Sequence, residues 1–228
     1  MRRELRDGAA SVAPMLVGVV PFGLVAGATP VEHDLGWAAA VGLSTIVFAG
    51  ASQLAAIDVL GDGGSALVAA LAAWTINLRM LLYSASLAPH LAAESVPTRL
   101  GVAYLLTDQA YAVSIQRWTV DHEPRERRVP YYLGAGLCLW LSWQAAIIAG
   151  VLIGPVVPDD VPLEFAVPLV FLVLLVPALS STPAVVAAVA GGLGAVIAAE
   201  AGAGTLSIMV GAIVGIAAGT VADLVRDR

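Results

Sequence analysis

The stretch HEPRERR, residues 122–128, holds three of the chain's 11 basic residues and separates two long apolar halves. Every basic residue is an arginine, and most of the others lie near the two ends or just before this stretch: Arg2, Arg3, Arg6, Arg117, Arg226 and Arg228. Positive charge collects in the cytoplasmic loops of membrane proteins, and apolar runs of about 20 residues span the bilayer. The pattern therefore predicts a polytopic membrane protein. Only Arg79 and Arg99 depart from it.

Composition agrees with this prediction. Hydrophobic residues make up 59% of the 228 residues and charged residues 12%, against roughly 45–50% and 25% in soluble domains. We expect an all-α integral membrane protein in the plasma membrane, with residues 1–228 forming a single transmembrane domain and both termini in the cytoplasm. About eight spans are expected, some of them kinked or discontinuous, at 10–29, 35–60, 64–90, 98–117, 129–153, 163–181, 183–200 and 204–223.

Several spans are expected to break. The second and third are longer than the bilayer requires, and their predicted break points are Gly50–Ser52 and Thr75–Asn77. In the first span, Pro21 should open the helix before Gly23, because proline lacks an amide hydrogen. Plain kinking is the alternative. The spans at 163–223 are rich in glycine and alanine and are expected to serve close helix packing.

Arg79 and Asp108 both fall near the middle of predicted spans. A charge at this depth costs about 3 kcal/mol or more unless it faces a partner, an interior or water. The pair could be a structural bridge, or Arg79 could extend to the membrane surface, or the two could form a transport site for a zwitterion. Other polar side chains on these spans are Ser52, Gln53, Asn77 and Tyr83.

Motifs for enzymatic chemistry are missing from the sequence, so we expect no enzyme and no cofactor. The three histidines, His33, His90 and His122, are too dispersed to predict a metal site. Cys138 is the only cysteine and lies in an apolar run. The acidic balance, with a formal charge of −6, argues against a nucleic-acid partner.

Four segments of the first half resemble a known family: PFGLVAGA at 21–28, FAGASQLAA at 48–56, INLRMLLYSASLAPHL at 76–91 and TDQAYA at 107–112. They are similar, in order and spacing, to the AzlC-like (LIV-E) branched-chain amino-acid exporters. Two positions depart from the family pattern: Met80 stands where a histidine is usual, and Gln109 where a glutamate is common. The resemblance implies export of leucine, isoleucine, valine or methionine, together with a small AzlD-like membrane subunit.

We therefore expect a secondary transporter driven by an ion gradient, with its site on the spans at about 10–117. Arg79 and broken helix ends at Pro21–Gly23, which includes Phe22, or at Gly50–Gln53 would bind the carboxylate. Small residues, namely Gly50, Ala51 and Ala55, would leave space for a branched apolar side chain. Asp108 would bind the ammonium or carry the coupling proton. Gln53, Asn77, Ser52 and Tyr83 would orient the ligand. The competing hypotheses are a non-transporting membrane scaffold or accessory subunit, and a transporter of another small organic solute.

Overall fold

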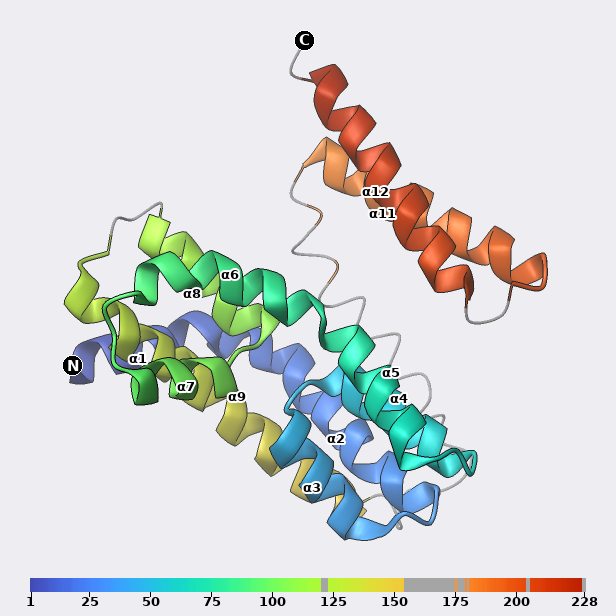
Figure 1. Cartoon of the computed structure of the whole chain (residues 1–228), viewed down its shortest axis with the longest axis horizontal. Coiled ribbons are helices and arrows are strands. Elements are labelled where there is room, and N and C mark those ends of the chain that lie inside the picture. The colour runs from blue at the N-terminus through green and yellow to red at the C-terminus, as the bar shows by residue number, and fades with distance from the viewer. Residues whose placement is uncertain (120–122, 154–174, 176–178, 180, 204–205, 227–228) are drawn as a thin grey trace. The chain divides into compact units, whose positions relative to one another are not determined.

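The structure, a computed structural model, describes residues 1–119, 123–153, 175, 179, 181–203 and 206–226. The described residues are mostly helical and contain no strand, which confirms the all-α class. The chain divides into two compact units, Met1–Val170 (unit 1) and Phe171–Arg228 (unit 2). Each unit is described by itself (Figure 1).

The first apolar segment of unit 1 runs through α1 (Arg2–Val12), the 3-10 turn η1 (Ala13–Met15) and α2 (Leu16–Glu32). At 31 residues it is long enough to cross a membrane. The break expected at Pro21–Gly23 is not observed, because Pro21 and Pro30 both lie inside α2. The carbonyl of Ala26, which the ring of Pro30 deprives of its helical donor, faces the side-chain amide of Gln53 at 3.5 Å.

Two further segments of unit 1 are long enough to cross. The first consists of α5 (Ala66–Asn77) and α6 (Arg79–Leu91), which meet at Leu78 with a bend of 46°. The bend directly follows the Thr75–Asn77 patch where a break is predicted. The second is the single helix α9 (Arg125–Ile153), 29 residues long.

The segment expected as the second span is instead a hairpin. Helices α3 (Gly36–Val47) and α4 (Gly50–Gly61) are separated by Phe48, whose φ of 42° and ψ of 43° are left-handed, and by extended Ala49. A side chain added at Gly61, the last residue of α4, would collide with His33, which directly follows α2. Both ends of the hairpin therefore lie at the C-terminal end of α2, and residues 35–60 enter and return without crossing.

The segment expected as the fourth span is a second hairpin, made of α7 (Val96–Tyr104) and α8 (Asp108–Thr119). Its two ends lie at the end of unit 1 that carries the N-terminus. Just before α7, Glu94 pairs with Arg125 at 3.7 Å. Near the end of α8, Arg117 pairs with Glu4 at 3.2 Å. The expectation of a crossing is thus wrong for 98–117 as well, because hydropathy records the length of an apolar run and not whether it turns back.

Unit 1 therefore alternates crossing segments and hairpins: α1–α2, the α3–α4 hairpin, α5–α6, the α7–α8 hairpin, and α9. The hairpins enter from opposite ends, as Figure 1 shows for α3 and α7. The stretch containing Arg125–Arg128 lies at the N-terminal end after two crossings, where the eight-span prediction needed four. This arrangement also moves Arg99, in the first turn of α7, to the N-terminal end. Of the described arginines in unit 1, Arg79 alone lies away from it.

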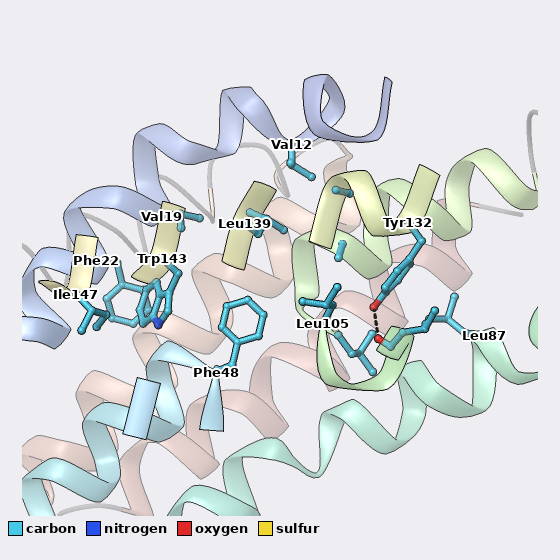
Figure 2. Close-up of a cluster of buried hydrophobic side chains, with 14 of the residues drawn as sticks. Val12, Val19, Phe22, Phe48, Leu87, Leu105, Tyr132, Leu139, Trp143 and Ile147 are labelled. Atoms are coloured by element: carbon cyan, nitrogen blue, oxygen red, sulfur yellow. Dashed lines mark hydrogen bonds between the residues drawn. The ribbon is translucent and has the colours of Figure 1, made fainter. Parts of the chain in front are cut away.

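The core of unit 1 forms along α9. Figure 2 shows Phe22 of α2 beside Trp143 of α9, and their rings meet edge-on with centroids 5.5 Å apart. Tyr132, fully buried on α9, donates a hydrogen bond to the carbonyl of Val102 in α7 at 3.0 Å, drawn as the dashed line. Gly134 lets α9 approach the backbone of α1, where a Cβ would collide with Leu5. The long helix thus holds the first crossing segment and the second hairpin.

Unit 2 is a pair of packed helices, α11 (Thr182–Glu200) and α12 (Leu206–Arg226). A Cβ on Gly211 would lie 2.6 Å from the carbonyl oxygen of Gly191, so the two backbones approach closely. Within the described residues, α11 is another helix long and apolar enough to cross a membrane. The span expected at 163–181 lies almost wholly outside the described residues, as does the C-terminal Arg228.

Candidate functional site

The tips of the two hairpins contact each other within unit 1. The hydroxyl of Tyr104, at the end of α7, donates a hydrogen bond to the carbonyl of Thr45 in α3 at 2.9 Å. The same hydroxyl accepts a hydrogen bond from the indole nitrogen of Trp140, near the middle of α9, at 3.0 Å. The ring of Phe48 lies 6.3 Å from that of Tyr104. The two hairpin tips and α9 therefore contact one another, while Thr45 and Tyr104 remain exposed at the surface of unit 1.

A cavity of about 260 Å³ lies at this meeting point. Its wall combines residues from three helix interruptions, namely Phe48–Ala49, the bend after Asn77, and the residues around Leu106. The complete lining is Ile46, Val47, Phe48, Ala49, Asn77, Met80, Leu81, Ser84, Ala103, Tyr104 and Leu106. We call this space the central cavity. Eight of the 11 lining residues are apolar and three, Asn77, Ser84 and Tyr104, are polar. The cavity is open on one side, where Ile46 and Leu81 are exposed.

The first turn of α4 begins at this cavity. Extended Ala49 precedes Gly50, and no side chain caps the helix. The first backbone amides of an uncapped helix lack intrahelical acceptors and carry partial positive charge. The break predicted at Gly50 is thus observed, and it directs a helix N-terminus toward the cavity wall. The corresponding start of α8 is capped, because the hydroxyl of Thr107 accepts from the amide of Ala110 at 3.2 Å.

Arg79 and Asp108 form an ion pair, with 3.0 Å between a guanidinium nitrogen and a carboxylate oxygen. Each is the first residue of its helix, α6 and α8. The side chains are 42% and 38% exposed, so the pair lies at an open face of unit 1. Tyr83 stacks on Tyr111 with ring centroids 4.4 Å apart, which joins the same two helices one turn further on.

Three acceptor oxygens near the site have no hydrogen-bond partner among the described residues: Asn77 Oδ1, Asp108 Oδ1 and Gln53 Oε1. Asn77 lines the central cavity. Gln53 is completely buried between α4 and α2. Buried acceptors without partners cost free energy, and they mark places where a bound donor would be stabilised. An ammonium group or an ordered water could supply such donors.

The other expected site residues lie elsewhere. Ser52 is buried and donates to the carbonyl of Ala49 at 2.8 Å. Phe22 and Gly23 pack against α9 around Trp143. A Cβ on Gly50 would lie 2.8 Å from Trp143 and would also collide with Phe22. The space expected beside Gly50 for a branched side chain is therefore filled by aromatic rings. These four residues shape the support behind the cavity and do not line it.

Sequence reasoning missed the aromatic tip residues Tyr104 and Phe48. A signal for the first was present, because Tyr104 precedes Leu-Leu-Thr-Asp, in which Thr107 is a typical helix cap. Recognition of that cap would have placed a helix start, and therefore an interruption, inside the apolar run at 98–117.

A second polar cluster lies at the N-terminal end of unit 1. Arg117 donates to Glu123 at 2.8 Å and pairs with Glu4 at 3.2 Å, while its guanidinium lies 4.3 Å from the centroid of the Tyr131 ring. The hydrogen bond to Glu123 raises the pKa of the Arg117 guanidinium. The two carboxylate side chains are each 8% exposed. This cluster fastens the end of α8 to α1 and to the start of α9.

Among the residues that the structure describes, no group of three His, Cys, Asp or Glu side chains could hold a metal ion. The site is defined instead by interrupted helices, a small cavity and an ion pair inside an all-helical membrane protein. Residues 14–157 match the family described as AzlC protein. The chain belongs to this family, and the matched residues include the whole central cavity.

Two relatives extend the likeness beyond the family match. The chain is 24% identical to the inner membrane protein YgaZ of Escherichia coli over 96% of this chain and 89% of that protein. It is 31% identical to an uncharacterized membrane protein of Archaeoglobus fulgidus over 82% of this chain and 81% of that protein. No solved structure matches this chain.

Proposed function

We propose that this protein is a secondary transporter that exports small apolar amino acids, such as leucine, isoleucine, valine and methionine. The observation that carries the proposal is the meeting of three helix interruptions at the central cavity. Interrupted helices at membrane depth are typical of transporter sites, where free backbone groups bind charged parts of a substrate. Membership of the AzlC family is consistent with transport.

The size and lining of the cavity support an amino acid as the ligand. Its volume of about 260 Å³ is slightly below the roughly 300–1,000 Å³ of pockets for drug-sized molecules. The wall offers aliphatic and aromatic side chains for an apolar substituent, from Ile46, Met80 and Leu106 among others. The uncapped start of α4 would bind the carboxylate, and Asn77 Oδ1 would accept from the ammonium.

Arg79 and Asp108 flank this arrangement as a switchable pair. Each neutralises the other at 3.0 Å when no substrate is bound. A zwitterion carries the same two charges. Its carboxylate can therefore replace Asp108 as the partner of Arg79 while its ammonium replaces Arg79 as the partner of Asp108, and no charge is left unpaired. Asp108 would then bind the ammonium or carry the coupling proton of an ion-gradient-driven cycle, and Arg79 would bind the carboxylate.

We further propose that the N-terminal end of unit 1 is cytoplasmic, in the plasma membrane. Support comes from the arginines, because Arg99 joins Arg117 and Arg125 at that end once the hairpins are recognised. A small AzlD-like membrane subunit is the proposed partner, as the family resemblance implies.

The direct test is export of radiolabelled leucine and methionine from cells that express this chain, with and without a candidate small subunit. A sugar that the cells cannot metabolise is the control solute. Export of the amino acids alone supports the proposal. If expression with the partner changes no export rate, while the protein is abundant and folded, the scaffold or accessory hypothesis takes its place.

Matched variants connect export to the site. Asn77→Leu removes a cavity acceptor and keeps a similar branched side-chain shape, and Asp62→Asn is the control, because Asp62 lies in the exposed turn after α4. We expect the first to reduce export roughly 5- to 150-fold, since an unpaired ammonium donor costs about 1–3 kcal/mol, and the second to leave it unchanged. Equal export by the two variants would show that Asn77 does not contribute to substrate binding.

A further inference from the structure

A second cavity, of about 150 Å³, lies between α6 and α7. It shares Ser84, Ala103 and Leu106 with the central cavity, so the two spaces adjoin. The remaining lining is Leu87, Ala88, Leu91, Arg99 and Val102. Apart from Ser84 and Arg99, every lining side chain is aliphatic. The second cavity is therefore an apolar passage with one cation on its wall.

The passage leads toward the N-terminal end of unit 1. Leu91 is the last residue of α6, and Arg99 is in the first turn of α7, so both lie near the base of the second hairpin. Ser84 and Leu106, by contrast, lie at the central cavity. Arg99 is the fourth residue of α7, about 4.5 Å along the axis from the first residue at 1.5 Å per residue. It stands at the outer mouth of the passage.

Arg99, like Arg2 and Arg6 at the same end, pairs with no carboxylate in the part of the chain that the structure describes, whereas Arg117 and Arg125 do. Of these three unpaired arginines, Arg99 lines the second cavity. A cation at the mouth of an apolar groove raises the local concentration of anionic groups. Arginines within membrane-embedded segments face cavities or partners more often than lipid. The combination fits a ligand with a carboxylate at one end and an aliphatic group at the other.

We propose that this cavity is the groove through which substrate passes between the N-terminal face and the central cavity, with Arg99 capturing the carboxylate at its mouth. This inference rests on the proposed function, and it assigns the route and a selecting residue to that same site. Small side chains at Ala88 and Ala103 leave the width that a branched aliphatic group needs.

The test is thiol accessibility in a Cys138→Ser background. Ala88→Cys and Ala103→Cys are exposed to a membrane-impermeant methanethiosulfonate in inside-out and right-side-out vesicles. The matched control is Ala85→Cys, which lies on the exposed surface of α6 but lines neither cavity. We expect the two groove cysteines to react from the N-terminal face only, and leucine to slow the reaction. The control should stay unreactive in lipid.

A second measurement concerns Arg99. Arg99→Gln should raise the leucine concentration for half-maximal export roughly three- to tenfold, with little change in maximal rate, because an exposed cation contributes mainly to capture. Arg99→Lys should restore most of the loss. Arg6→Gln removes a charge from the same end and should have no effect.

The outcomes separate this inference from the proposed function. If both groove cysteines are unreactive in variants that still export leucine, or react without protection by leucine, the groove is not the route. If wild-type protein exports no leucine at all, the proposed function fails by a measurement independent of labelling. An equal effect of Arg6→Gln and Arg99→Gln would assign the change to general surface charge and overturn the role of Arg99.

Discussion

The pair Arg79–Asp108 permits a quantitative prediction by a double-mutant cycle. The perturbations are Arg79→Gln, Asp108→Asn and both together. At the observed 3.0 Å, two unit charges attract by about 1.4 kcal/mol in water and about 5.5 kcal/mol at an effective dielectric constant of 20. Because the side chains are 42% and 38% exposed, solvent screening reduces the higher figure strongly. We expect a coupling free energy of roughly 1–2 kcal/mol, above most surface pairs and below a fully buried pair.

The assay is reversible unfolding of the purified protein in mixed micelles, titrated with sodium dodecyl sulfate, for the wild type and the three variants. Each single variant should lose stability, because it leaves one charge near the membrane centre without its partner. The double variant should regain part of that loss. A coupling free energy below about 0.5 kcal/mol, the usual error of additivity, would contradict a pairing of the two side chains in the folded protein.

Three further predictions follow from the same structure. Asp108→Asn should abolish gradient-driven leucine export while sparing leucine-for-leucine exchange if Asp108 carries the coupling proton; loss of both would make it an ammonium ligand. Single cysteines at Asp62 and Glu94 in a cysteine-free background should react with an impermeant reagent from opposite faces of the membrane, with Glu94 on the N-terminal face, and the reverse assignment would restore the eight-span topology. Gly134→Ala should destabilise the protein by about 1–3 kcal/mol through overpacking, since its Cβ would collide with the α1 backbone. Gly42→Ala, with open space around the new Cβ, should instead raise the free energy of unfolding by about 0.5–1 kcal/mol. Equal unfolding midpoints for the two variants would argue against the packing described for α9.

The fold class was predictable from sequence because it depends on apolar content and on the arginines. The two hairpins were not predictable in the same way. Residues 35–60 and 98–117 are apolar over a length that could cross a bilayer, and hydropathy does not record the reversal at Phe48 or at Leu105–Thr107. The direction of return is set by tertiary contacts, such as Gly61 against His33. Arg99 does not fit the arginine pattern of the eight-span prediction. This was the signal in the sequence that one of the expected spans does not cross the membrane.

At the site, sequence reasoning succeeded where a charge had to find a partner. Arg79 and Asp108 were the two ionisable residues assigned to mid-depth, so electrostatics alone favoured their pairing, and they lie 3.0 Å apart. Sequence reasoning failed where the role of a residue depends on side chains that are distant in the sequence and pack against it in the fold. Gly50 reads as open space in the sequence, but the rings of Phe22 and Trp143 occupy that space. Only the packed structure shows which small residues line a cavity and which allow an aromatic ring to approach.

The contact of both hairpins with α9 has a consequence for biogenesis. Helices α3 and α4 have 12 residues each, about 18 Å at 1.5 Å per residue, so neither can leave the insertion machinery as a stable crossing segment. The interrupted backbone at their tips needs a protein cover in place of lipid. Part of that cover is Trp140 and Trp143, which the ribosome makes only after both hairpins. A chain truncated before α9 would therefore lack these contacts at the hairpin tips, and we expect it to be less stable in the membrane than the full chain.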